Sequence, residues 1–226
     1  MNVKEFENQR WSHDNQKVFF RHKAALDLVL NEKSGQNISV LDLGCGDGLF
    51  LSLLKEKGIK GKGLDISIEG VKKAQEKGLD ASIFDFSGPL PMGVGYFDIV
   101  VALDVLEHLY DPQKLLLEAS KIAKKSVIIG VPNFNSLPAR LQVMFGRVPE
   151  NNRPNKGHVY WFNLKVLKKM AEKTGLKVSE IRTNAPMSNR FIIGKVFQLL
   201  AKTWPSMFAL SFVVRMEKIN LQSSTR

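Results

Sequence analysis

The most constraining feature of the sequence is a glycine-rich turn between a hydrophobic strand and a helix. Residues 40–48 read VLDLGCGDG, and the residues after them have the apolar spacing of a helix. Glycines at 44, 46 and 48 let backbone N–H groups approach a ligand, because no Cβ stands in the way. The N-terminus of the following helix adds unpaired N–H donors and a positive dipole end. The segment therefore predicts a ligand-binding turn in an α/β fold.

Strands and helices alternate along the chain. The strands are apolar throughout, which is typical of strands that are buried on both faces. The pattern predicts an α/β, Rossmann-like fold: a doubly wound, mostly parallel seven-stranded sheet with an antiparallel edge strand. Strands are expected at 38–44, 61–65, 81–84, 96–103, 126–131, 176–183 and 207–218, and helices at 15–31, 47–57, 68–77, 112–123, 163–173 and 190–203.

Two carboxylates near the turn indicate the kind of ligand. Asp65 ends the next strand, and a carboxylate there can accept both hydroxyls of a ribose. A dinucleotide-binding turn would carry a third glycine where Leu49 stands, and a triphosphate-binding loop would carry a GK[ST] motif, which the sequence lacks. Asp42 would repel a pyrophosphate but suits a positively charged group. These charges favour S-adenosylmethionine, which has an amino group, a sulfonium and no phosphate.

The same residues resemble the class I S-adenosylmethionine-dependent methyltransferases. VLDLGCGDG is similar to their first motif, GLDIS to the second, DF at 85–86 to the third and FDIVVALDVLEHL to the fourth. The resemblance covers residues 38–131 best and implies an enzyme with S-adenosylmethionine as its cofactor. The implied cofactor site consists of Asp42, Gly44 and Gly46 at the methionine half with Cys45 between them, Asp65 at the ribose, Ile66, Asp85 and Phe86 at the adenine, and Leu103 at the methyl-donor pocket.

The chain reads as one domain, because no linker divides its 226 residues. We expect an N-terminal helical cap at 1–37, in which the region from Trp11 to Phe20 folds over the donor. A donor-binding core follows at 38–131, then an insertion at 132–161 and the C-terminal part of the sheet at 162–226.

A group of polar residues follows the strand at 96–103. His108 is a candidate general base for an acceptor hydroxyl, with Glu107 beside it as a second catalytic residue. The spacing also resembles that of ubiquinone-pathway O-methyltransferases, which implies Asp104, Glu107 and His108 as metal ligands. A third interpretation is structural, with Glu107 capping a turn and His108 packing beneath a loop. The sequence leaves the three interpretations open, and we assign no metal at this point.

The long insertion at 132–161 is the candidate acceptor wall. It follows a strand of the parallel sheet, so it should lie at the edge where open α/β folds bind their ligands. Arg140, Arg147 and His158 are its candidate substrate-binding residues, because guanidinium groups pair with carboxylates and phosphates. They predict a small, anionic acceptor. A solvated helical excursion is the alternative.

Positive charge is concentrated in the second half of the chain. Residues 1–113 contain 13 basic and 17 acidic residues, whereas residues 114–226 contain 20 basic and 5 acidic residues. A nucleic acid is not the expected partner, because no nucleic-acid-binding motif accompanies the charge. The apolar stretch FIIGKVFQLLAKTW, punctuated by Lys195 and Lys202, fits either peripheral contact with a membrane or a core helix with an edge strand.

The sequence therefore favours methyl transfer from S-adenosylmethionine to a small, anionic acceptor, with O-methylation preferred. Its single cysteine, Cys45, excludes a disulfide framework, and the absence of an apolar leader favours the cytoplasm. The stretches VPNFNSLPARLQVMFGRVPENN and GHVYWFN also resemble the MetW family. That resemblance implies an alternative function, a non-catalytic regulatory or partner subunit that retains the donor pocket. The oligomeric state does not follow from the sequence.

Overall fold

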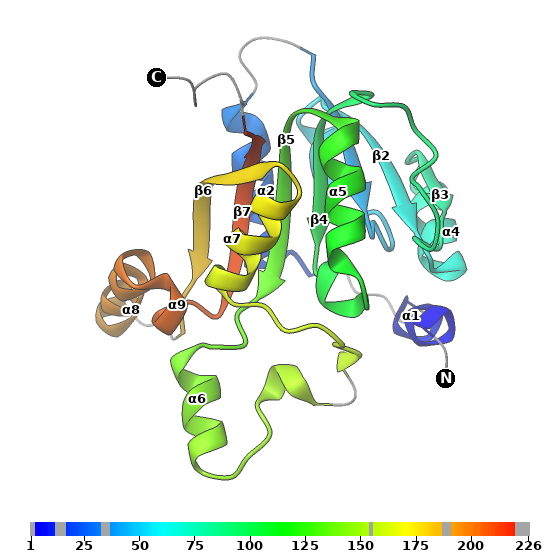
Figure 1. The fold of residues 1–226 in the computed structure, drawn as a ribbon. Coiled ribbons are helices and arrows are strands. Elements are labelled where there is room, and N and C mark those ends of the chain that lie inside the picture. The colour runs from blue at the N-terminus through cyan, green and yellow to red at the C-terminus, as the bar shows by residue number, and fades with distance from the viewer. Residues whose placement is uncertain (1–2, 12–16, 33–36, 154–155, 187–190, 220–226) are drawn as a thin grey trace, which may run out of the picture.

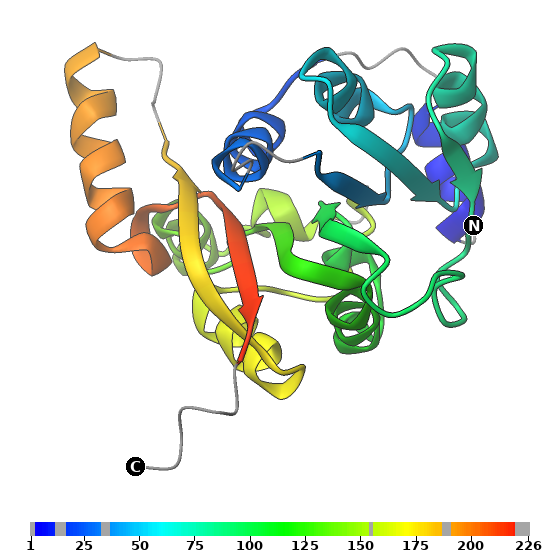
Figure 2. The same cartoon turned by 90° about the horizontal axis from the view of Figure 1, so that it is seen from above.

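The computed structural model of the chain describes residues 3–11, 17–32, 37–153, 156–186 and 191–219. Its strands form one sheet in the order β3-β2-β1-β4-β5-β7-β6 (Figures 1 and 2). The strands are β1 (Ser39–Leu43), β2 (Lys60–Asp65), β3 (Ala81–Ile83), β4 (Phe97–Leu103), β5 (Ala123–Pro132), β6 (Leu176–Asn184) and β7 (Ser211–Lys218).

Helices connect these strands and flank both faces of the sheet, as the view along it shows (Figure 2). They are α1 (Val3–Trp11), α2 (Phe20–Asn31), α3 (Leu49–Glu56), α4 (Ile68–Glu76), α5 (Pro112–Ile122), α6 (Leu137–Met144), α7 (Leu164–Lys173), α8 (Phe191–Thr203) and α9 (Pro205–Phe208), with the 3₁₀ turns η1 (Leu106–His108) and η2 (Glu150–Asn152).

The strand directions confirm the predicted fold. Strands β3, β2, β1, β4 and β5 pair in parallel, whereas β7 pairs antiparallel with both β5 and β6. The sheet is thus mostly parallel with antiparallel pairing at one edge. The antiparallel strand itself is β7, the last in the chain, which lies one position in from the edge because β6 forms the outermost strand.

Two hydrophobic layers hold the sheet between its helices. On one face, Leu28 of α2 and Leu54 of α3 are fully buried against the sheet. On the other face, Leu116 of α5 and Leu167 of α7 are fully buried in a second cluster. Burial on both faces explains why the strands are apolar throughout rather than alternating.

The strand register gathers the carboxyl ends of the parallel strands at one edge. Leu43 of β1 pairs with Leu64 of β2 and with Ala102 of β4, and Leu103 pairs with Gly130 of β5. The segments after these four strands therefore leave the sheet close together. In open α/β sheets this edge is where ligands bind.

Most predicted boundaries agree closely with the structure, and three differ from it. Strand β5 begins at Ala123 rather than 126, because its exposed lysines extend it beyond its buried part. The last strand begins at Ser211 rather than 207, because Pro205 starts the short helix α9. The helix predicted at 15–31 begins at Phe20. Residues 12–16 of the predicted cap, and residue 190 of the helix predicted at 190–203, lie outside the described residues.

The insertion at 132–161 is a folded excursion that is fixed at both ends. Near its start, Nδ2 of the buried Asn133 donates a hydrogen bond to the carbonyl oxygen of Ala209, at 2.8 Å. Near its end, the backbone N–H of Tyr160 donates to the carbonyl oxygen of Glu107, at 3.0 Å. These bonds hold the insertion against the segment that precedes β7 and against the turn that follows β4.

A buried histidine lies in the first turn of α2. Nδ1 of His22 accepts a hydrogen bond from the backbone N–H of Phe19, at 3.1 Å, and an accepting ring nitrogen carries no proton. Burial, together with the positive charge of Arg21, lowers the pKa of His22 to about 4. The imidazole is therefore neutral in the folded protein at neutral pH.

We expect the free energy of unfolding to depend on pH through His22. Its folded-state pKa lies below the ordinary value of 6.5. Its stabilising contribution is therefore complete above pH 6.5 and is lost as the pH falls toward 4. His22→Gln should remove up to about 3 kcal/mol of this acid-induced loss. Urea denaturation of both proteins across this pH range measures the difference, and identical pH profiles would contradict the assignment.

Candidate functional site

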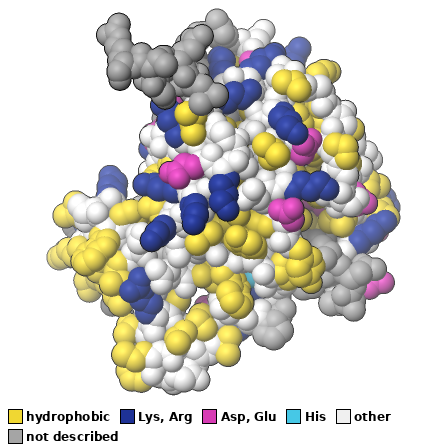
Figure 3. All heavy atoms as spheres, viewed as in Figure 1, with side chains coloured by type: hydrophobic (Ala, Val, Ile, Leu, Met, Phe, Trp, Pro, Cys, Tyr) yellow, Lys and Arg dark blue, Asp and Glu magenta, His cyan; other side chains and the backbone are white. Residues whose placement is uncertain are grey.

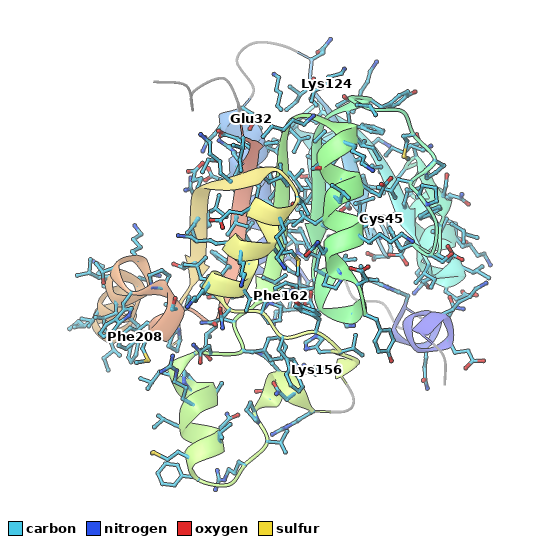
Figure 4. The ribbon with its side chains drawn as sticks, viewed as in Figure 1. Glu32, Cys45, Lys124, Lys156, Phe162 and Phe208 are labelled. Atoms are coloured by element: carbon cyan, nitrogen blue, oxygen red, sulfur yellow. The ribbon has the colours of Figure 1, made fainter. Side chains whose placement is uncertain are left out.

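A cavity of about 240 Å³, called the first cavity here, lies at the carboxyl edge of the sheet. It contains most of the cofactor residues that the sequence predicts, and His108 as well. Figure 4 labels Cys45, which belongs to the glycine turn beside it. Gly46 and Glu107 are not part of its lining. The predicted residues that line the first cavity are Asp42, Gly44, Cys45, Asp65, Ile66, Asp85, Phe86, Leu103 and His108.

The glycine turn requires glycine at two positions. Gly44 and Gly46 have φ values of 76° and 51°, in the left-handed region that side chains disfavour. A Cβ on Gly44 would lie 2.3 Å from Cγ2 of Val105, and one on Gly46 would lie 2.1 Å from the ring of Trp11. Trp11 of α1 thus covers the turn.

The carboxylate of Asp65 is fixed by two backbone amides. The N–H of Gly46 donates to Oδ2 at 2.7 Å, and the N–H of Ser67 donates to Oδ1 at 2.7 Å. The side chain is buried and lines the first cavity. Each carboxylate oxygen has a further lone pair, so this orientation suits a ligand that donates two hydrogen bonds, as a ribose does.

A second buried carboxyl group, that of Asp42, lies in the same wall. Burial, with the repulsion of Asp65, raises the pKa of Asp42 well above its usual range. A cationic ligand beside it would favour the ionised form of Asp42 and would itself be stabilised. Burial, with the repulsion of Asp42, also raises the pKa of the Cys45 thiol. Cys45 is therefore a packing residue of the turn and not a nucleophile.

The predicted adenine end of the first cavity contains a strained residue. Phe86 has a φ of 58°, which is rare for a bulky side chain. Its ring meets that of Phe84 edge-on, with centroids 5.4 Å apart. Hydrogen bonds from the backbone and hydroxyl of Ser87 lower the pKa of the exposed Asp85, so Asp85 presents an ionised acceptor. Strained backbone conformations of this kind cluster at ligand sites.

Asp104 does not join Glu107 and His108, which corrects the predicted metal set. Its Oδ2 lies 2.9 Å from Nε of Arg21, and its own φ is 55°. Among the described residues, the group that could hold a metal ion is Glu107, His108 and His158, whose ligand atoms lie within 4.8 Å of one another.

Both histidines of this group face it with the same ring nitrogen. Nδ1 of His108 lies 3.1 Å from the carbonyl oxygen of Gly157, and Nδ1 of His158 lies 2.8 Å from that of Asn151. A carbonyl oxygen only accepts, so each Nδ1 donates and carries a proton, which leaves Nε2 as the ring nitrogen available to face the group. This arrangement suits either a base or a metal ligand, since metal-binding histidines are commonly oriented in this way.

A second cavity, of about 340 Å³, adjoins the first. The insertion, the carboxyl end of β5 and the segment before β7 line it, including Ser136, Gln142 and Leu210. The side chains of Phe19, Arg21 and Asp104 line both cavities. These three residues, called the shared wall here, lie where the two cavities meet.

The cation beside the candidate acceptor site in the structure is not one of the predicted arginines. Arg140 and Arg147 are exposed, and neither lines the first or the second cavity. Arg140 donates from Nε to the carbonyl oxygen of Asn135 instead. His158 lies against His108, with ring centroids 4.9 Å apart. The cationic side chain that lines both cavities is Arg21, which pairs with Asp104. The sequence interpretation missed it, although FFRH immediately before the apolar helical spacing placed aromatic and cationic groups together.

Comparisons of the sequence identify a family and relatives. The family model described as a methyltransferase domain matches residues 11–181. Ubiquinone biosynthesis O-methyltransferase of Chromobacterium violaceum is 28% identical over 164 residues, which cover 67% of this chain and 69% of that relative. Norajmaline N-methyltransferase of Rauvolfia serpentina is 31% identical over 103 residues, which cover 42% of this chain and 35% of that relative. Relatives that methylate oxygen and relatives that methylate nitrogen thus both match.

Solved structures share the fold. Magnesium protoporphyrin IX methyltransferase from Synechocystis, with bound S-adenosylhomocysteine, superposes with a TM-score of 0.69 at 17% identity, covering 96% of this chain and 98% of that one. An S-adenosylmethionine-dependent methyltransferase from Archaeoglobus fulgidus gives 0.64 at 23% identity, covering 87% and 92%. The chain therefore belongs to the methyltransferase domain family and is an enzyme of the class I S-adenosylmethionine-dependent type.

Proposed function

We propose that the protein transfers a methyl group from S-adenosylmethionine in the first cavity to a small, anionic acceptor in the second. The observation that carries this proposal is that the two cavities adjoin at one shared wall, Phe19, Arg21 and Asp104. Methyl transfer depends mainly on holding donor and acceptor in line at close range. Two cavities that share a few lining side chains would hold donor and acceptor at such close range.

The residues of the first cavity fit the donor's chemistry. Asp65 would accept the ribose hydroxyls, Phe86 and Ile66 would pack on the adenine, and Asp85 would accept from its amino group. The glycine turn would hold the methionine half close to Asp42, whose charge complements a cation. When bound, S-adenosylmethionine supplies a methyl group on a positively charged sulfur that an acceptor lone pair can attack.

Residues of the shared wall and of the first cavity favour an acceptor with both an anionic group and a hydroxyl. Arg21 would pair with the anionic group, because its guanidinium borders both cavities. Nε2 of His108 would remove the proton of the hydroxyl, since Nδ1 is already committed to a carbonyl oxygen. Glu107 and His158 would orient His108 in this role. O-methylation is therefore the preferred reaction.

Asp65→Ala should weaken binding of S-adenosylhomocysteine by roughly 100-fold, because two charge-assisted hydrogen bonds to the ribose are lost. Asp65→Asn, which keeps the shape of the side chain, should show a smaller loss. Isothermal titration calorimetry measures both affinities. Asp80→Ala, an exposed aspartate before β3, is the matched control and should bind like the wild type. Equal affinity of all four proteins would exclude the ribose role of Asp65.

His108→Ala should lower kcat by about 100-fold or more, which is the usual contribution of a general base. Donor affinity should not change, and the rise of kcat with pH should be lost. The measurement is a pH profile of turnover with an acceptor found among phenols, carboxylic acids and amines. If a chelator abolishes turnover and Mn²⁺ restores it, Glu107, His108 and His158 act as metal ligands instead. Donor binding without turnover on any acceptor would favour the non-catalytic, MetW-like function.

Arg21→Met should raise KM for carboxylate-bearing acceptors by roughly tenfold or more, because a charge-assisted hydrogen bond is lost. Neutral acceptors should be affected much less. Arg140→Met is the matched control and should behave as the wild type, since Arg140 lines neither cavity. A loss of donor affinity with an unchanged acceptor KM would place Arg21 at the donor instead.

A further inference from the structure

Exposed hydrophobic side chains are concentrated on two separate segments of the chain. Of the 20 large hydrophobic side chains that are exposed among the described residues, 12 lie within residues 141–161 and 192–204. The most exposed of them are Phe145, at 72%, and Ile192, at 74%. Single exposed apolar residues are ordinary, whereas a concentration of this size marks an interaction surface.

Helix α8 is apolar on both of its faces. Gly194 and Ala201 are buried, and the ring of Phe197 contacts that of Phe208, with centroids 6.5 Å apart. Ile192 and Leu199 lie on the outer side and are exposed. Apolar side chains that gather exposed on the outer side of a helix indicate a surface that a partner covers.

The second segment extends away from the body of the protein. Helix α6 lies below the sheet in Figure 1, beyond the carboxyl end of β5. Its last turn and the loop after it expose Val143, Met144, Phe145 and Val148. Exposed apolar side chains at the end of a projecting helix are suited to insertion between other molecules.

The strand register places both segments at the same edge of the sheet. Ser211 pairs with Pro132 at the end of β5 and with Asn184 at the end of β6. Helix α6 follows Pro132, and α8 with α9 lies between Asn184 and Ser211. Figure 4 shows Phe208 of α9 on the left side of the molecule and Lys156 of the insertion in its lower half.

The same two segments carry nearly all their charge as cations. Residues 137–161 and 191–210 contain six basic side chains and a single acidic one, Glu150. Figure 3 shows hydrophobic groups at the lower left and at the bottom, with lysine and arginine between them. Trp161 and Trp204 are both exposed, and tryptophan prefers the boundary between lipid and water.

We propose that α8 and the α6 loop together dock the protein on an anionic lipid bilayer. Apolar side chains would enter the headgroup region while the surrounding lysines and arginines pair with lipid phosphates. None of the described helices has the length and apolar character needed to cross a membrane, so the protein would lie on the surface. Three of the six cations are lysines, Lys156, Lys195 and Lys202. Because protein interfaces are depleted in lysine, these three favour lipid over a protein partner.

The docking surface lies next to the second cavity. Pro132, Asn184 and Ser211, which mark the edge from which α6 and α8 leave the sheet, also line that cavity. Bound to a bilayer in this orientation, the protein would open its second cavity toward the lipid. The docking itself does not rest on the proposed activity, because it involves neither the donor residues nor the shared wall.

Co-flotation of the full chain with vesicles tests the proposal. Vesicles of phosphatidylcholine with phosphatidylglycerol should carry the wild type, and vesicles of phosphatidylcholine alone should carry much less. Ile192→Ser with Leu199→Ser should weaken binding by roughly tenfold for each side chain removed from lipid. Arg153→Gln with Lys202→Gln should weaken it by about fivefold for each charge. Phe145→Ser tests the α6 loop in the same way.

The matched controls lie elsewhere on the surface. Val94→Ser, on the exposed loop before β4, and Lys72→Gln, on the outside of α4, should bind vesicles like the wild type. Binding of S-adenosylhomocysteine verifies that every variant is folded. Absence of co-flotation with anionic vesicles, or equal co-flotation of the α8 variant, overturns the proposal. A dimer that the α8 variant disrupts, without vesicle binding, would also overturn it and assign the face to a second copy of the chain.

Discussion

The site depends on one buried carboxylate that two neighbouring strand ends hold in place. Asp65 ends β2, and it accepts the N–H of Gly46 from the turn after β1 and that of Ser67 from the start of α4. These bonds tie the glycine turn to the next strand–helix connection and fix both oxygens toward the first cavity. The turn can lie this close to Asp65 because Gly44 and Gly46 have backbone conformations that residues with a side chain rarely adopt.

The sequence predicted those parts of the fold and site that depend on residues close together in the chain. The alternation of apolar strands and helices predicted the sheet, and the turn at 40–48 with Asp65 predicted one wall of the first cavity. Contacts between segments that are distant in the chain could not be predicted from the sequence. The pairing of Asp104 with Arg21 joins residues on opposite sides of the glycine turn in the chain, and His158 reaches His108 only because the insertion folds back. Arg140 and Arg147 had suitable chemistry, but α6 and its loop direct them away from both cavities.

The first and second cavities differ in how strongly the chain specifies them. The first is built from strand ends and one turn, which rigid packing on both faces of the sheet supports. The second is built from the insertion and from the segments that flank β7, elements that follow the parallel part of the sheet. Donor chemistry is therefore set by the core of the fold, whereas acceptor choice rests on residues added around it. The proposed donor and acceptor sites meet at the shared wall of Phe19, Arg21 and Asp104.

A crystal structure with S-adenosylhomocysteine tests this account most directly. The account predicts density in the first cavity, with both ribose hydroxyls on the carboxylate of Asp65 and the sulfur directed at the shared wall. It also predicts that Trp11 of α1 lies over the bound molecule. An empty first cavity, or a ligand whose ribose lies away from Asp65 and whose sulfur points away from the second cavity, would contradict it.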